Sequence, residues 1–147
     1  MRILVTGSES FIGKTLISQL QTTGHEIIGF DSLEPTNPTY EFHQIDIRNP
    51  EINKLIPRNT DVLIHLAALS RDSDCKNKAI ECFDVNVMGT LNLIKAAQLQ
   101  KVKQFIFASS EWVYDKFIDS EEKNENSEIN IDNHNSEYAL SKLVTES

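Results

Sequence analysis

Short apolar runs alternate with helical patterns along the whole chain, and this alternation restricts the fold more than any single motif does. Five runs are rich in Ile, Val, Leu and Phe and are bounded by turn residues, as buried parallel strands are. They are Arg2–Thr6, Glu26–Phe30, Tyr40–Ile45, Val62–Leu66 and Gln104–Ala108. Strand, helix and strand in repetition predict an α/β fold with a doubly wound parallel sheet.

Helical patterns fill the segments between these runs. They cover Phe11–Thr23, Glu51–Ile56, a long segment from about Lys76 to Leu99, and the end of the chain from Ser136. Gly24 follows the first pattern and Pro50 precedes the second, and both residue types are common at such helix ends. Because crossovers between parallel strands are right-handed, a ligand crevice is expected at the carboxyl ends of the strands.

The composition is that of one globular domain. A chain of 147 residues, 39% hydrophobic and 24% charged, is long enough to bury a core, and it has no apolar run of membrane-spanning length. The net charge of −8 argues against nucleic acid or an anionic membrane as a partner. Nine acidic and two basic residues between 111 and 137 account for most of this charge, which predicts a long, solvated polar loop there.

The cysteines and histidines do not indicate a metal site. Cys75 and Cys82 form neither a CxxC motif nor a spacing typical of metal ligands, and the four histidines are scattered. We therefore expect reduced thiols, no metal and, without an export signal, a cytoplasmic protein.

A glycine-containing turn follows the first strand, with the sequence Thr6-Gly7-Ser8-Glu9-Ser10-Phe11-Ile12-Gly13. Such a turn brings backbone N–H groups and a helix N-terminus against a pyrophosphate. Gly7 would make the tight turn, and Gly13 would let helix and strand pack closely. Ser10 stands where the middle glycine is usual, so its β-carbon is expected to crowd the phosphates while its hydroxyl could donate a hydrogen bond. An ordinary strand-to-helix turn is the alternative.

Two carboxylates follow the next strands. Asp31, after the second strand, could accept hydrogen bonds from both ribose hydroxyls and repel a 2′-phosphate, which favours NAD over NADP. A turn-forming Asp before Ser32 is the alternative. Asp46, after the third strand, could meet the adenine amino group or be a loop carboxylate.

A Tyr and a Lys lie four residues apart near the end of the chain, and hence on one helical face. An ammonium group beside a phenol stabilises the phenolate, so Lys142 would make Tyr138 an acid/base near neutral pH. Ser110, after the last strand, would orient the same substrate oxygen. A surface pair on a helix is the default explanation for Tyr-x-x-x-Lys taken alone.

These stretches together resemble the N-terminal part of the extended short-chain dehydrogenase/reductase family, which includes the NAD-dependent nucleotide-sugar epimerases and dehydratases. The similar stretches, in the order usual for the family, are Thr6-Gly7 with Phe11-Ile12-Gly13, Asp31, Asp46-Ile47-Arg48, His65-Leu66-Ala67-Ala68, Asn86-Val87-Met88-Gly89-Thr90, Ser109 to Tyr114, and Ser136 to Glu146.

The resemblance implies a Rossmann-like domain that binds NAD, with Ser110, Tyr138 and Lys142 as the catalytic residues. Asn86 would belong to the network that supports Lys142. The residues expected to contact the cofactor are Gly7, Ser10, Phe11, Ile12, Gly13, Asp31, Asp46, Ile47, Leu66, Ala67, Ala68, Asn86, Tyr138 and Lys142.

The resemblance also narrows the reaction. Dehydratases of this family carry a catalytic Glu two residues after the Ser or Thr, and here that position is Trp112, with Glu111 before it. We therefore expect 4-epimerase chemistry first, in which NAD accepts a hydride from sugar C4 and Tyr138 takes the hydroxyl proton. A 4-keto-sugar reductase is the alternative.

Family members are about twice as long as this chain. The resemblance therefore implies that residues 1–147 form a cofactor-binding domain truncated before the substrate subdomain, inactive alone, which would take a nucleotide sugar only with the missing half. Family members often form a homodimer through the long helix and the Tyr138 helix, and the sequence leaves the oligomeric state open. The alternative of a different class is a non-catalytic dinucleotide-binding or interaction module.

Overall fold

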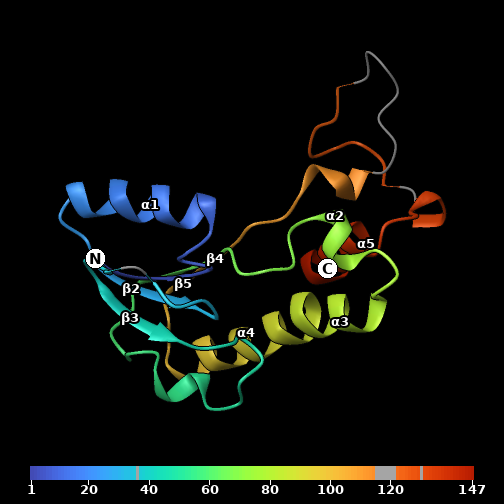
Figure 1. Cartoon of the computed structure of the whole chain (residues 1–147). Helices are drawn as coiled ribbons and strands as arrows, with labels where there is room; N and C mark the ends of the chain where they lie inside the picture. Colours follow the sequence, from blue (N-terminus) through green and yellow to red (C-terminus); the bar gives the residue numbers. More distant parts are fainter. Residues whose placement is uncertain (36, 115–121, 130) are drawn as a thin grey trace. The chain divides into compact units, whose positions relative to one another are not determined.

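The computed structural model describes residues 1–35, 37–114, 122–129 and 131–147 (Figure 1). Two compact units make up the chain. The first contains Met1–Ala68 and Met88–Ala108, and the second contains Leu69–Val87 and Ser109–Ser147.

In the described part of the first unit, five parallel strands form one sheet with the order β3-β2-β1-β4-β5. The strands are β1 (Arg2–Thr6), β2 (Glu26–Asp31), β3 (Glu41–Gln44), β4 (Val62–His65) and β5 (Gln104–Phe107). The order reverses beside β1, as in a doubly wound sheet. The predicted α/β fold with a parallel sheet is confirmed, and β1 has the predicted bounds.

Helices cover both faces of this sheet. Figure 1 shows α1 (Phe11–Thr22) on one face and α4 (Thr90–Leu99) on the opposite face. A sheet covered on both sides has apolar strands throughout, and Leu4, Ile28 and Leu63 are indeed fully buried. Because helices cover both faces, polar side chains can reach a ligand only at the ends of the strands. In this fold the relevant ends are the carboxyl ends of β1 and β4.

The predicted helix Glu51–Ile56 is shorter than expected. The structure has a single 3-10 turn, η1 (Ile52–Lys54), in which the Leu55 N–H donates to the Ile52 carbonyl. Pro57, two residues after Leu55, disfavours helical backbone at Ile56.

The second unit contains short helices: α2 (Asp72–Cys75), α3 (Ala79–Phe83), η3 (Glu111–Tyr114), η4 (Ile131–Asn133) and α5 (Glu137–Glu146). The helical segment predicted from about Lys76 to Leu99 starts three residues later, at Ala79, because Asn77 has a φ of +61° and separates α2 from α3. Helix resumes at Ala79 and passes through the π-helical turn η2 (Asp84–Gly89) before α4 begins. Asparagine is one of the few residue types that adopt this conformation readily, and that was the only local signal of the break.

The cysteines differ from the prediction. Cys75, the last residue of α2, forms a disulfide with Cys82 of α3, with 5.1 Å between their Cα atoms. The expectation of reduced thiols is therefore wrong. The turn at Asn77 brings the two short helices together, and a spacing of seven residues does not reveal such a turn.

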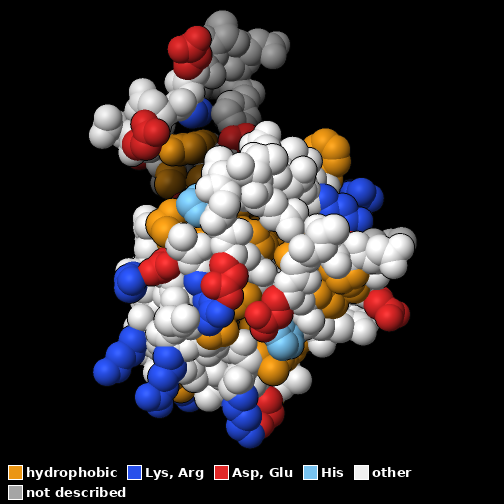
Figure 2. All heavy atoms as spheres, turned by 90° about the vertical axis from the view of Figure 1, so that its left-hand side faces the viewer, with side chains coloured by type: hydrophobic (Ala, Val, Ile, Leu, Met, Phe, Trp, Pro, Cys, Tyr) orange, Lys and Arg blue, Asp and Glu red, His pale blue; other side chains and the backbone are white. Residues whose placement is uncertain are grey.

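Part of the acidic segment lies outside the described residues, namely 115–121 and 130. The predicted long polar loop there is therefore described only in part, and its described portion includes the short helix η4. On the face drawn in Figure 2, acidic and basic side chains lie interspersed. None of the helices in the described residues is long and apolar enough to span a membrane.

Candidate functional site

The turn after β1 depends on glycine at two positions. Gly7 has a φ of +69°, and its N–H donates to the Phe30 carbonyl at 2.8 Å. A β-carbon at Gly7 would lie 2.8 Å from the Ala67 nitrogen. At Gly13 a β-carbon would lie 2.2 Å from the Gly7 carbonyl oxygen, so the first turn of α1 packs directly on the backbone of the turn. Both glycines are needed for the shape that would hold a pyrophosphate.

Ser10 is the N-cap of α1. Its φ is −68°, which any residue adopts, and its Oγ accepts a hydrogen bond from the Gly13 N–H at 3.0 Å. The side chain therefore stabilises the helix start and stands in for a glycine without backbone strain. Whether its hydroxyl also donates to a phosphate stays a prediction. Phe11 and Ile12, the first helical residues, are exposed.

Asp31 ends β2 beside the turn. Its Oδ2 accepts a hydrogen bond from the Glu9 N–H at 2.9 Å, and its Oδ1 accepts one from the Leu33 N–H at 3.0 Å. The carboxylate is thus held by backbone donors on both sides, and each oxygen keeps capacity for a further donor. That leaves the predicted role toward a ribose open.

Asp46 and Ile47 follow β3. The Asp46 carboxylate pairs with the Arg48 guanidinium at 2.6 Å, and hydrogen bonds from Arg48 hold the pKa of Asp46 below its usual value. Ile47 is buried, and a β-carbon on Gly89 would lie 2.7 Å from its Cδ1. The Ile47 side chain therefore packs under the start of α4.

The segment after β4 is tied to the first turn. The Leu66 N–H donates to the Thr6 carbonyl at 3.1 Å, and the Ala67 N–H donates to Thr6 Oγ1 at 3.3 Å. Thr6 Oγ1 also lies 2.6 Å from His65 Nδ1, and His65 Nε2 lies 2.8 Å from Thr90 Oγ1. This buried polar chain supports the turn from below. This hydrogen-bonded chain was not predicted from the sequence. The polar residues Thr6 and His65 within apolar strands were the signal that could have indicated it.

The Tyr and Lys of the last helix lie in the second unit and are both buried. Tyr138 is 9% exposed and Lys142 5% exposed, on the face of α5 that packs inward. Ser136 caps this helix, since its Oγ accepts from the Ala139 N–H and donates to Asp72 Oδ1 at 2.6 Å. The default explanation of a surface pair is therefore wrong.

Burial changes the acidity of the lysine. It lowers the pKa of the Lys142 ammonium from 10.5 to about 8, and the nearby Glu146 carboxylate opposes part of this shift. At neutral pH most Lys142 side chains are then protonated, and the ammonium loses its proton about one pH unit above neutrality.

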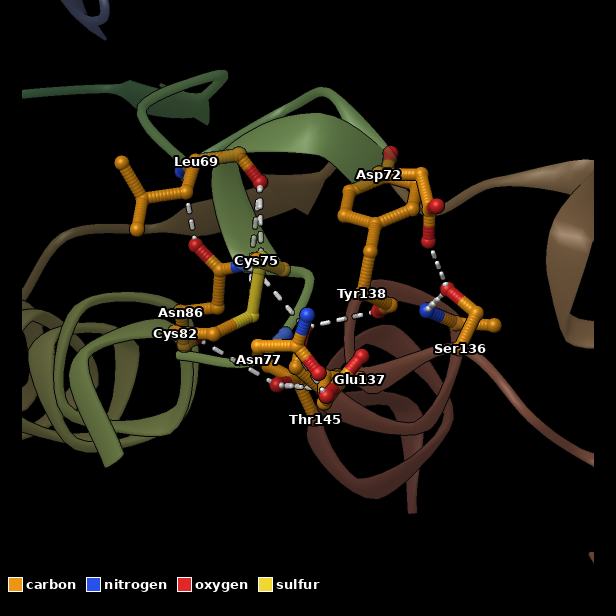
Figure 3. The surroundings of a disulfide bond; sticks show 12 residues. Leu69, Asp72, Cys75, Asn77, Cys82, Asn86, Ser136, Glu137, Tyr138 and Thr145 are labelled. Atoms are coloured by element: carbon orange, nitrogen blue, oxygen red, sulfur yellow. Dashed lines mark hydrogen bonds between the residues drawn. A yellow bond between two sulfur atoms is a disulfide. The ribbon is translucent and has the colours of Figure 1, made fainter. Parts of the chain in front are cut away.

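Tyr138 packs against the disulfide. Figure 3 shows the Cys75–Cys82 bridge beside Tyr138, and the three residues form one buried apolar cluster with Leu69 at its edge. The Trp112 ring meets the Tyr138 ring nearly edge-on, with 6.3 Å between centroids. The phenol is therefore held on two sides by groups that sequence reasoning did not connect with it.

Asn86 holds the same cluster through its amide (Figure 3). Its Oδ1 accepts from the Leu69 N–H at 2.8 Å, and its Nδ2 donates to the Leu69 carbonyl at 3.1 Å and to Ser141 Oγ at 2.9 Å. Ser141 precedes Lys142 on α5, so Asn86 contacts the helix of the Tyr and Lys through Ser141.

Ser110 stands just before η3. Its Oγ accepts from the Trp112 N–H at 3.3 Å, and its carbonyl accepts from the Val113 N–H at 3.2 Å. Ser110 shares the second unit with Tyr138, Lys142 and Asn86, while the remaining predicted site residues, from Gly7 to Ala68, belong to the first. Among the described residues, no group of three His, Cys, Asp or Glu is arranged to hold a metal.

Comparison with known proteins identifies the family. The profile of the NAD dependent epimerase/dehydratase family matches residues 3–147. The chain belongs to this family. The predicted resemblance is confirmed, and so, at the level of the family, is NAD as its cofactor.

Individual relatives share about a third of their aligned residues with this epimerase/dehydratase chain. A UDP-glucose 4-epimerase from Klebsiella pneumoniae is 34% identical over 128 residues, which are 78% of this chain and 92% of that protein. A 3 beta-hydroxysteroid dehydrogenase/Delta 5→4-isomerase from Mycobacterium tuberculosis is 34% identical over 119 residues, 74% of this chain and 31% of that protein.

A solved structure supports the same assignment for the fold. The UDP-glucose 4-epimerase of Thermus thermophilus in complex with NAD is 28% identical, with a TM-score of 0.90, over 99% of this chain and 49% of that one. This epimerase/dehydratase chain therefore spans about half the length of the solved relative.

Proposed function

We propose that this chain is the NAD-binding part of a nucleotide-sugar 4-epimerase. The observation that carries the proposal is the buried pair Tyr138 and Lys142, four residues apart on α5, in a chain that matches the NAD-dependent family from residue 3 to residue 147. A buried phenol and ammonium on one helical face suit proton transfer, because burial and a neighbouring charge shift the acidity of such groups.

The residues of the first unit fit NAD. A β-carbon at Gly7 or Gly13 would collide with neighbouring backbone atoms, so the turn needs glycine at both positions. Ser10 caps α1, and Asp31 lies at the end of β2. We assign the phosphates to the turn and the ribose hydroxyls to Asp31. Further contacts are assigned to the predicted residues Phe11, Ile12, Asp46, Ile47, Leu66, Ala67 and Ala68.

The proposed chemistry divides between cofactor and protein. When bound, NAD would supply reversible hydride transfer at C4 of the sugar. Tyr138 takes the proton of the C4 hydroxyl and returns it, and Ser110 orients that oxygen. Lys142, cationic below its pKa of about 8, stabilises the Tyr138 phenolate and binds the nicotinamide ribose, with Asn86 in its supporting network.

Elimination of water is not part of the proposal. A 4,6-dehydratase needs a carboxylate two residues after the serine, and this chain has Trp112 there. Trp112 packs on the Tyr138 ring, which gives the residue a structural role in place of an acid/base one.

The test uses the full-length protein that contains these residues. Tyr138→Phe is expected to lower the rate of C4 epimerisation of a nucleotide hexose at least ~100-fold, a typical general acid/base contribution. Tyr114→Phe, in the neighbouring η3, is the matched control and keeps the activity. Full turnover by Tyr138→Phe would rule out the assigned role.

A second candidate is oxidation of a hydroxyl on a non-sugar substrate. The steroid dehydrogenase relative, as similar in identity as the epimerase relative, favours it. Release of NADH during turnover separates the two candidates, because an epimerase returns its hydride and a dehydrogenase does not. A 4-keto-sugar reductase would consume NADH instead. A homodimer and a cytoplasmic location stay predictions, and sedimentation of the full-length protein tests the former.

A further inference from the structure

The turn after β1 contains an acidic side chain that is not exposed to solvent. The Glu9 side chain is only 8% exposed. Its Oε1 accepts a hydrogen bond from the Tyr40 hydroxyl at 2.6 Å, and its Oε2 pairs with the Lys14 Nζ at 3.1 Å. A carboxylate held by two side chains at this depth has a defined position on the turn, unlike a solvated surface charge.

Glu9 also adjoins Asp31. The Glu9 backbone N–H donates to Asp31 Oδ2 at 2.9 Å, so the two acidic residues meet at the end of β2. Lys14, on the first turn of α1, is the cation that pairs with Glu9, and its side chain is 61% exposed. Burial and the Glu9 hydrogen bond raise the pKa of Tyr40 to about 12, so the phenol stays a neutral donor. The group Glu9, Lys14 and Asp31 therefore carries a net charge of −1.

We propose that Glu9 is a second specificity-determining residue, which favours NAD over NADP by holding Lys14 away from a 2′-phosphate. This inference rests on the proposed function, namely that the turn binds NAD. Asp31 would repel the added phosphate directly. Glu9 acts together with Asp31 in two ways. It adds a second negative charge near Asp31, and it forms an ion pair with the Lys14 ammonium, which could otherwise bind a 2′-phosphate.

The ion pair makes this role different from a merely structural one. Loss of a structural contact would weaken both dinucleotides alike. Loss of the Glu9 charge instead takes the group from −1 to 0 and leaves the exposed Lys14 ammonium without its carboxylate partner. Only the dinucleotide with the extra phosphate gains from that change, and the gain falls as salt rises because the charges are partly exposed.

The experiment is a calorimetric titration of the chain with NAD⁺ and with NADP⁺, at low and at high salt. We expect the unchanged chain to bind NAD⁺ more tightly. Glu9→Gln is expected to shift the ratio of the two affinities toward NADP⁺ by about tenfold, an effect typical of one partly exposed charge pair, and less at high salt. Adding Lys14→Gln to this variant is expected to abolish the gain.

Two further variants make the outcome decisive. Lys14→Gln alone changes an exposed side chain, so it tests the idea even where Glu9→Gln does not fold, and it is expected to move the ratio further toward NAD⁺. Glu26→Gln removes an exposed charge at the start of β2 and should leave the ratio unchanged. If Glu9→Gln binds NAD⁺ and the ratio of the NADP⁺ and NAD⁺ affinities is unaltered, the role of Glu9 is overturned and the proposed function stands. If the unchanged chain binds neither dinucleotide, the proposed function is overturned as well.

Discussion

The Asn86 amide nitrogen lies 2.9 Å from Ser141 Oγ, and so joins the π-helical turn η2 to the helix α5 that carries the Tyr and Lys. The Ser141 hydroxyl in turn donates to the Tyr138 carbonyl at 2.7 Å. Both residues are buried, and their hydrogen bonds satisfy polar atoms that have no access to solvent. Much of the order of α5 should therefore depend on one asparagine.

Replacement of Asn86 should destabilise the second unit. Asn86→Ala leaves the Leu69 N–H and carbonyl without their side-chain partners, and we expect a loss of about 2–3 kcal/mol in the free energy of unfolding. Urea denaturation followed by Trp112 fluorescence measures it. Asn53→Ala in η1 is the control, and a similar loss there would mean that the effect is not specific to Asn86.

Lys142 should make stability depend on pH in the alkaline range. The pKa of Lys142 is about 8 in the folded chain and 10.5 in the unfolded chain. Between pH 8 and 10.5 the unfolded chain therefore binds more protons than the folded chain, and the free energy of unfolding rises with pH. Below pH 8 the buried charge costs stability, at most about 3 kcal/mol. Lys142→Met should thus be more stable than the unchanged chain at pH 7, with the difference vanishing near pH 10.5.

Thermal melts across this pH range test the prediction for Lys142. Lys95→Met, which removes an exposed ammonium on α4, should show no such convergence. A constant difference between Lys142→Met and the unchanged chain from pH 7 to 10.5 would contradict the lowered pKa. On the proposed function, the rate of epimerisation should fall as Lys142 loses its proton above pH 8.

The disulfide should contribute to the stability of the second unit. Cys75–Cys82 closes a short loop, for which the chain-entropy estimate is about 2 kcal/mol. Addition of a dithiol reductant should lower the urea midpoint by a corresponding amount, and the variant with both cysteines changed to Ala should not respond. Titration of two thiols in the unfolded, unreduced chain would show that the bond is absent.

Ser10 should act as a helix cap. Ser10→Ala loses the bond to the Gly13 N–H and should cost about 1 kcal/mol, whereas Ser10→Gly should cost only a few tenths. Denaturation of both variants measures the difference. Equal stability of the two would indicate that the cap contributes nothing. NAD⁺ titration of Ser10→Gly tests separately whether the β-carbon crowds the phosphates.

The local pattern of the sequence determined the strands and the helix α1 of the first unit. The run Arg2–Thr6 and the amphipathic segment from Phe11 carry their own signal, because alternation with turn residues and the spacing of apolar positions reflect burial directly. Gly7 and Gly13 were recognisable for the same reason, since a close approach of backbone leaves room for glycine alone. The pairing of Tyr138 with Lys142 followed from helical spacing.

Tertiary structure decided what depends on contacts between distant segments. The Cys75–Cys82 bond and the burial of Glu9 by Tyr40 have no local signature, because each arises where separate pieces of chain pack together. The hydrogen bonds of the Asn86 side chain span up to 55 residues for the same reason. Propensity and periodicity describe one segment at a time, and these features belong to pairs of segments.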